Sequence, residues 1–261
     1  MATIYGRKIM QQGFERFIGI DYSGAKSPDD ALSGLRIFSA NRNGSAQEIR
    51  PKSLRHWSRR QIYSWLADEI HQGPPTLIGI DHGFSFPRIY FLRHALKSWP
   101  EMLQHFVQHT PSHESSIEDL RHQHRVHIES ASSLRLCETW TSSAKSVFHF
   151  DVQGSVAKST YAGLPWIHFL HQDLHDFLFC WPFDGWIPPE GRSVICEVYP
   201  SLYKRRYPRA DRGNDAHDAY AVVRWMQDMQ QRGILNEYFE PPLYPDEQSI
   251  AQLEGWILGV R

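Results

Sequence analysis

Two short apolar runs in the first third of the chain each end on an aspartate. Phe17-Ile18-Gly19-Ile20 precedes Asp21, and Leu77-Ile78-Gly79-Ile80 precedes Asp81. An apolar run of this length is typical of a strand buried on both faces, as in the centre of a mainly parallel sheet. The glycine two residues before each aspartate leaves room for another backbone or a ligand to come close. Because ligands bind at the carboxyl ends of such strands, we expect the two carboxylates to point into one crevice.

The alternation of apolar and polar residues elsewhere predicts three more strands and two well-defined helices. Hairpin and capping signals, such as Asn43-Gly44 and Ser58, mark several of their boundaries. The predicted strands span residues 31–40, 46–49 and 193–199, and the predicted helices span 58–72 and 215–231, the latter capped by Asn214 and ended by Gly233. This order of elements predicts the α/β class.

The region between the fourth and fifth predicted strands, residues 88–190, has no regular strand pattern. Helical spacing of apolar residues predicts helices over 101–109, 117–136 and 166–178, and most of the fifteen histidines also fall in this region. A structureless loop of this length is improbable in a compact domain. We therefore expect a mostly helical insertion, folded over the crevice, within a single domain of residues 1–261.

Composition and charge narrow the class of protein further. The chain has 261 residues, a formal net charge of −1 and three widely spaced cysteines. A near-neutral chain has no global field for polyanions, so any nucleic-acid contact must come from local basic patches. Residues 1–12 lack the apolar segment of a signal peptide, and no apolar stretch approaches 18 residues. The sequence predicts a cytoplasmic protein that is not in a membrane, and it leaves the oligomeric state open.

Further acidic residues lie on the late elements. Asp215 and Asp218 are three apart in the first turn of the last predicted helix, and Glu197 lies in the fifth predicted strand. If that helix packs near the ends of the strands carrying Asp21 and Asp81, these carboxylates converge and repel one another unless a cation lies among them. Oxygen-only ligands favour Mg²⁺ or Mn²⁺. Two such ions can activate a water for phosphodiester hydrolysis.

The layout of strands and acids resembles the ribonuclease H-like superfamily, and the run from Asn214 to Ala221 resembles the last helix of its RuvC-type branch. Five motifs within residues 17–87 and 193–259 also resemble the domain-of-unknown-function family 429, whose members are described as predicted nucleases. The motifs are Gly19-Ile20-Asp21, Gly79-Ile80-Asp81-His82-Gly83-Phe84-Ser85-Phe86-Pro87, Cys196-Glu197-Val198-Tyr199-Pro200, Asn214-Asp215-Ala216-His217-Asp218-Ala219 and Glu254-Gly255-Trp256-Ile257-Leu258-Gly259.

The resemblance implies a mixed five-stranded sheet of order 3-2-1-4-5 with strand 2 antiparallel. It also implies that the five acidic residues Asp21, Asp81, Glu197, Asp215 and Asp218 line a metal site. The function it implies is that of a metal-dependent phosphodiester hydrolase, most simply a nuclease using two metal ions.

Basic and histidine residues supply candidates for the rest of the site. The connection containing Lys204, Arg205, Arg206 and Arg209 has two interleaved tyrosines and suits a phosphate backbone, although a solvated loop explains the same run. The same alternatives apply to the basic residues around Trp57, which are Arg50, Lys52, Arg55, Arg59 and Arg60.

Histidines beside the acidic motifs are candidates for proton transfer, namely His82 and His217. Two histidine clusters in the insertion, at 122–127 and 168–175, lack a carboxylate or cysteine at a known zinc spacing, so a polar helix flank is the simpler interpretation.

Two other functions stay open. Gly19-Ile20-Asp21-Tyr22-Ser23-Gly24 also resembles the first phosphate loop of sugar kinases and actin-like ATPases. Those enzymes need a second glycine-rich loop, whereas here Asp81 leads into Phe84-Ser85-Phe86-Pro87. A non-catalytic nucleic-acid-binding module with the same fold is the other alternative.

Overall fold

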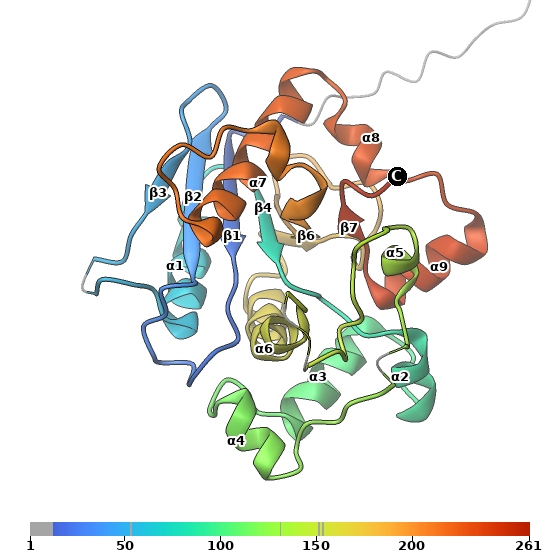
Figure 1. The fold of residues 1–261 in the computed structure, drawn as a ribbon. Helices are drawn as coiled ribbons and strands as arrows, with labels where there is room; N and C mark the ends of the chain where they lie inside the picture. The colour runs from blue at the N-terminus through green and yellow to red at the C-terminus, as the bar shows by residue number, and fades with distance from the viewer. Residues whose placement is uncertain (1–12, 53, 131, 151, 153) are drawn as a thin grey trace, which may run out of the picture.

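A mixed β-sheet forms the centre of the computed structural model, which describes residues 13–52, 54–130, 132–150, 152 and 154–261 (Figure 1). Residues 1–12, for which the sequence predicts no signal peptide, lie outside this description. The strands are β1 (Arg16–Asp21), β2 (Arg36–Asn41), β3 (Gln47–Ile49), β4 (Thr76–Asp81), β5 (Leu178–Cys180), β6 (Ser193–Val198) and β7 (Ile257–Leu258).

The strands are ordered β3-β2-β1-β4-β6-β5, and β7 pairs with β6 at its far end. β1 runs antiparallel to β2 and parallel to β4, which in turn is parallel to β6. The protein is thus an α/β protein, but in the part of the chain that the structure describes the sheet has seven strands instead of the predicted five. The difference comes from β5 and β7, which are too short to give a period-two signal in the sequence.

Helices flank the sheet and fill the region between β4 and β6. They are α1 (Arg59–Gln72), α2 (Arg88–Arg93), α3 (Trp99–His109), α4 (Ile117–His122), α5 (Leu136–Thr139), α6 (Ala157–Asp173), α7 (Asn214–Gln231), α8 (Leu235–Phe239) and α9 (Pro245–Glu254), with 3₁₀ turns η1 (Pro200–Leu202) and η2 (Lys204–Arg206). Among the described residues, none of these helices combines the length and apolar composition that a bilayer crossing demands.

Each face of the sheet has its own hydrophobic core, because successive residues of a strand point to opposite faces. On β1, Ile18 and Ile20 pack with α1, α3 and α6, whereas Phe17 packs on the other face with α7, α8 and α9. Figure 1 shows α7 lying across the face of the sheet that carries Phe17, in front of β1 and β4. Full burial of an aliphatic side chain such as Val222 of α7 contributes about 1.5–3 kcal/mol.

The two predicted helices outside the insertion form close to their predicted limits. Ser58 caps α1 through a capping box with Gln61, as its sequence position predicts. α7 ends before Gly233, which has a positive φ of 73° and continues the chain where other residues would be strained. Its N-cap is Gly213 rather than the predicted Asn214, which is instead the first helical residue.

The insertion departs most from the sequence-based expectation. Of the helix predicted over 117–136, only α4 forms within these bounds, and α5 begins at the last predicted residue; the described residues between the two helices are in neither helix nor strand. The helix predicted over 166–178 instead spans Ala157–Asp173, and Leu178 belongs to β5. The first half of α6 is buried on all sides from Ser159 to His168. A helix without a polar face shows no amphipathic period, which is why its start was not predicted.

Helix α6 lies beyond the carboxyl ends of β1 and β4 (Figure 1). The hydroxyl of Thr160 accepts a 2.9 Å hydrogen bond from the backbone N–H of Gly83, just after β4. A Cβ at Gly163 would lie 2.4 Å from Nε2 of His82, so this part of α6 must be small to fit there. The insertion therefore packs on the loop that follows β4.

The closing Glu254 acts as a cap for two other helices. Its carboxylate accepts hydrogen bonds from the backbone N–H of Arg88 at 2.5 Å and of Leu136 at 2.6 Å, which are the first residues of α2 and α5. Buried helix ends need such partners because their first N–H groups have none within the helix. Glu254 therefore ties the end of α9 to the start and to the middle of the insertion.

Candidate metal centre

The aspartates that end β1 and β4 lie side by side. In the parallel pairing of the two strands, Asp21 is the direct partner of Asp81, just as Gly19 is the partner of Gly79. Because side chains alternate between faces, both aspartates share the face of the two glycines, which is also the face covered by α7. The repeated Gly-Ile-Asp pattern thus places two carboxylates side by side at the carboxyl ends of two central strands, a position called here the sheet edge.

The glycines let α7 come close enough to add a third carboxylate. A Cβ at Gly19 would lie only 2.4 Å from the carbonyl oxygen of Ala219, and one at Gly79 would lie 2.8 Å from Cγ1 of Val222. Real Cβ atoms do not approach other atoms this closely, so only glycine admits the helix. The close packing holds Asp218, at the start of α7, next to the two strand ends.

Carboxylate oxygens of Asp21, Asp81 and Asp218 all lie within 4.8 Å of one another, and each residue is partly buried. Burial raises the pKa of Asp21 well above its usual value, and repulsion from Asp81, Asp215 and Asp218 raises it further. Burial and the charges of Asp218 and Glu197 likewise raise the pKa of Asp81. A divalent cation would relieve this repulsion, and an oxygen-only donor set fits Mg²⁺ or Mn²⁺.

One cation of the protein itself already contacts the cluster. Nζ of Lys204, from η2, lies 2.8 Å from Oδ2 of Asp218. Its charge lowers the pKa of both Asp21 and Asp81, but this effect is smaller than those of burial and of the acidic neighbours. The basic connection predicted to contact nucleic acid therefore contributes one residue directly to the acidic site.

Asp215 is not part of the group formed by Asp21, Asp81 and Asp218, but it lies next to it. It is exposed, in the first turn of α7, and its charge contributes to the raised pKa of Asp21. Its Oδ2 would lie 3.5 Å from a Cβ at Gly34, in the loop that leads into β2. Asp215 also lines a surface pocket of about 270 Å³ together with Arg36, Arg50 and Arg212.

Glu197 points to the opposite face of the sheet from the three aspartates. In the β4–β6 register it is the partner of Ile80, whereas Cys196 and Val198 lie on the α7 face. Both of its carboxylate oxygens bind the buried guanidinium of Arg135, at 2.6 and 2.7 Å. Its nearest link to the aspartates is a small cavity of about 20 Å³, lined by Asp81, Arg135 and Glu197, which has room for one water molecule.

The two histidines next to the aspartates make backbone contacts. Nε2 of His217 donates to the carbonyl oxygen of Lys204 at 3.2 Å, and burial lowers the pKa of this imidazole. Nδ1 of His82 lies 2.8 Å from the carbonyl oxygen of Gly83, and burial lowers its pKa to about 4. Both side chains are therefore neutral at pH 7, and His217 helps to position the backbone that carries Lys204.

The other predicted basic residues differ in exposure. Arg205, Arg206 and Arg209 are exposed on the connection before α7. Arg59, grouped by sequence with the basic residues around Trp57, is only 1% exposed. Its guanidinium donates to the carbonyl oxygens of Ser23, Ala25 and Lys26, and so holds the loop that follows β1. Arg59 is thus a structural residue of the site and does not belong to a binding surface.

Arg135 is the important residue that sequence reasoning missed. Besides Glu197, it binds Glu138 at 2.9 Å, and both side chains are 1% exposed. The Arg135-x-x-Glu138 spacing in an apolar context is a local signal for such a pair, but nothing in the sequence relates it to Glu197, 62 residues away. The structure brings Arg135, Glu138 and Asp81 together in the lining of one small cavity.

Comparison of the chain with protein-family models, with curated proteins and with solved structures finds no match.

Proposed function

We propose that this protein is a metal-dependent phosphodiester hydrolase of the ribonuclease H-like type, with nucleic acid as its substrate. The observation that carries the proposal is the group formed by Asp21, Asp81 and Asp218, whose oxygens lie within 4.8 Å of one another. Three partly buried carboxylates, of which Asp21 and Asp81 have raised pKa values, favour a site that gains stability when a divalent cation binds. Mg²⁺ and Mn²⁺ are the ions that such oxygen ligands prefer.

Each acidic residue has a distinct role in this proposal. Asp21, whose charge interacts with those of Asp81, Asp215 and Asp218, would hold the first ion together with Asp81 and Asp218. Asp215, which is exposed beside this group, would hold a second ion. When bound, the ions supply Lewis acidity and a nucleophilic water. Glu197 lines the small cavity beside Asp81, but both of its oxygens bind Arg135, and it is not a metal ligand in this proposal.

The surroundings of Asp215 support a polyanionic substrate. Arg36, Arg50 and Arg212 line the pocket of about 270 Å³ next to this residue, together with Glu48, which forms ion pairs with Arg36 and Arg50. Arg205 and Arg206 are exposed on the connection that carries Lys204. Arginine side chains suit phosphate groups because their planar fork of donors matches two phosphate oxygens. A phosphate backbone in this pocket would lie next to the carboxylates.

The direct test is cleavage of single- and double-stranded DNA and RNA with Mn²⁺ or Mg²⁺ by the full chain and by Asp21→Asn and Asp81→Asn. We expect metal-dependent cleavage by the wild type and a loss of at least about 100-fold in both variants, because each removes a ligand of the ion. Asp176→Asn, at an exposed acid whose ion partner is His175, is the matched control and should keep full activity.

Thermal unfolding of the metal-free proteins excludes a folding defect as the cause. Asp21→Asn removes a charge from a group of mutually repelling carboxylates. It should therefore increase the free energy of unfolding by on the order of 1 kcal/mol and raise the melting temperature. Cleavage that persists in both variants, or that needs no divalent ion, would contradict the proposed mechanism. ATP binding without cleavage of any nucleic acid would favour the kinase-like alternative instead.

A further inference from the structure

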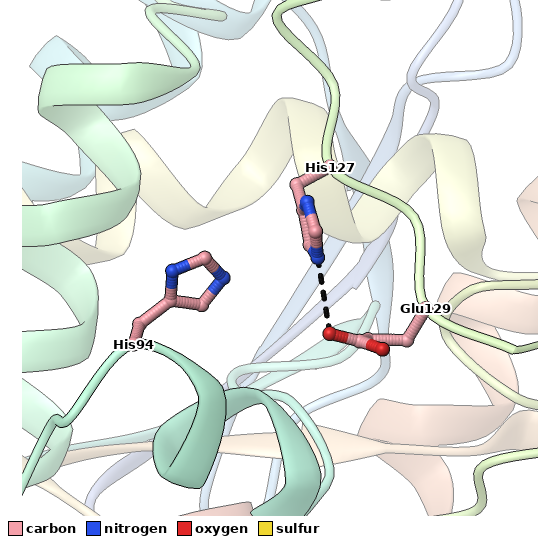
Figure 2. Close-up of side chains that lie close together, drawn as sticks. All are labelled: His94, His127 and Glu129. Carbon is pink, nitrogen blue, oxygen red and sulfur yellow. Dashed lines mark hydrogen bonds and ion pairs between the residues drawn. The ribbon is translucent and has the colours of Figure 1, made fainter.

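A second group of metal-ligand side chains lies in the insertion, on elements that carry none of the three aspartates. His94 directly follows α2, while His127 and Glu129 lie two residues apart in the irregular segment after α4. Ligand atoms of the three residues lie within 4.8 Å of one another. Figure 2 shows the three side chains directed toward a common point from the two segments.

One atom of this group lacks a partner that its burial calls for. Nε2 of His94 is buried and has no hydrogen-bond partner among the described residues. In Figure 2 this nitrogen faces the gap between His127 and Glu129. A buried polar atom without a partner is costly, and native structures rarely leave one so. A cation bound at this point would give the His94 nitrogen its partner.

The surrounding residues hold the three side chains in place. The ring of Tyr90 lies 4.5 Å from that of His94, centroid to centroid, and Tyr161 of α6 donates a hydrogen bond to the carbonyl oxygen of His127. The Glu129 side chain is only 4% exposed. Because both segments are fixed by packing on buried tyrosines, little reorganisation is needed for metal binding.

The positions of the ligand atoms suit a small transition-metal ion. Nε2 of His127 lies 3.0 Å from Oε1 of Glu129, and the widest separation in the group is at most 4.8 Å. Zinc bonds of about 2.1 Å place tetrahedral ligand atoms about 3.4 Å apart, within this range. Two imidazole nitrogens and one carboxylate form a softer donor set than the three aspartates, and imidazole favours zinc over magnesium.

Arg93 is the group that competes with a metal ion at this site. Its Nη1 lies 2.7 Å from Oε2 of Glu129 and 3.4 Å from Nε2 of His127. The arginine binds the outer oxygen of the carboxylate and leaves Oε1 toward the two histidines. Its side chain is 51% exposed, so it can move away when a cation binds. In the absence of metal, it offsets the charge of the buried Glu129.

We propose that His94, His127 and Glu129 form a zinc-binding site, with Nε2 of each histidine and Oε1 of the glutamate as ligands. Three protein ligands leave a fourth position for water, and the 43% exposed His127 places that position at the surface. Zinc here would join the end of α2 to the segment between α4 and α5, two parts of the insertion separated by about thirty residues of sequence.

The test is the binding of Zn²⁺ to the untagged full chain, measured by competition with a chromophoric chelator. The chain carries Asp21→Asn and Asp81→Asn, so that the carboxylates at the sheet edge do not contribute. We expect one zinc ion per chain and a loss of at least about 100-fold in affinity on adding His94→Gln or His127→Gln. His175→Gln, at a 70% exposed histidine outside the cluster, is the matched control and should leave the affinity unchanged.

Two further readouts distinguish this site from a purely electrostatic cluster. Co²⁺ in place of zinc should give the intense visible absorption of a four-coordinate ion, and this absorption should disappear with His127→Gln. Arg93→Met should tighten zinc binding, because it removes the competing cation. Chains that bind no zinc, or that bind it equally with and without His94 and His127, would overturn the proposal and leave an Arg93–Glu129–His127 ion cluster. Because His127 is exposed, its substitution should not prevent folding.

Discussion

The molecule holds two groups of metal-ligand side chains built by opposite means. The group at the sheet edge consists of aspartates positioned by strand register and by a helix packed on two glycines. The group in the insertion consists of two histidines and a glutamate positioned by irregular segments and by tyrosines. The first is a hard oxygen site, while the second has nitrogen donors and suits zinc. The difference teaches that strand register and irregular segments can gather donor sets of different chemistry in one chain.

The largest expected effect concerns which acids belong to the sheet-edge group. Glu197→Gln should lower the free energy of unfolding by about 3–5 kcal/mol, because it leaves the buried Arg135 cation without its main partner. Metal-dependent cleavage per folded molecule should be retained, since both oxygens of Glu197 already bind arginine. Denaturant unfolding measures the first effect, and a cleavage assay at low temperature measures the second. Loss of metal binding without loss of stability would place Glu197 among the ligands.

The second prediction tests whether the two groups are independent. Asp81→Asn should weaken Mn²⁺ binding by at least about 100-fold, or about 2.7 kcal/mol, and leave Zn²⁺ binding unchanged, whereas His127→Gln should have the reverse effect. Titration calorimetry of each variant with each ion gives all four values. If either substitution weakens the binding of both ions equally, the two groups are coupled and are not independent sites.

The third prediction concerns the close approach of α7. Gly19→Ala should destabilise the protein by about 1–3 kcal/mol and weaken Mn²⁺ binding, because its Cβ would lie 2.4 Å from the Ala219 carbonyl oxygen and push the helix outward. Zinc binding in the insertion should not change. Gly44→Ala is the matched control, since its Cβ would meet nothing closer than 3.6 Å. An unaltered Mn²⁺ affinity in Gly19→Ala would show that Asp218 is not a ligand.

The last prediction is a pH dependence of stability, which changes the free energy of unfolding only gradually with each pH unit. The folded state raises the pKa of Asp21 and Asp81 above their unfolded values, so it favours their protonated forms. The stability that they contribute is present at low pH and is lost as the pH rises from about 4 toward 8, by up to about 1.4 kcal/mol per unit. We expect the melting temperature of the metal-free protein, relative to Asp81→Asn, to fall over this range.

Two comparisons sharpen this measurement. His82 has a lowered pKa of about 4, so its contribution has the opposite sign and is lost as the pH falls from about 6.5 toward 4. Subtracting the Asp81→Asn curve removes that contribution. Lys204→Met should move the fall to higher pH, because Lys204 lowers the pKa of both aspartates. Saturating Mn²⁺ should remove most of the pH dependence, and a wild-type curve parallel to that of Asp81→Asn would rule out the assigned repulsion.

Much of the sheet and of its acidic edge could be predicted because the signals are local. The repeated Gly-Ile-Asp run predicts a buried strand, a close approach and a terminal carboxylate within a few residues. Ser58 with Gln61 predicts the start of α1 from four residues. Such patterns survive in any tertiary context that buries them. The helices of the insertion could not be predicted to the same degree, because burial of α6 on all sides hides its period.

The sequence alone determined that aspartates end two similar strands and that a late helix carries two more acids, because backbone geometry and side-chain alternation act over a few residues. Only the tertiary structure decided which acids meet. Strand register put Asp21 beside Asp81 and turned Glu197 to the other face, where Arg135 binds it. It also brought His94 to His127 and Glu129, a contact between segments whose separation no local pattern can encode.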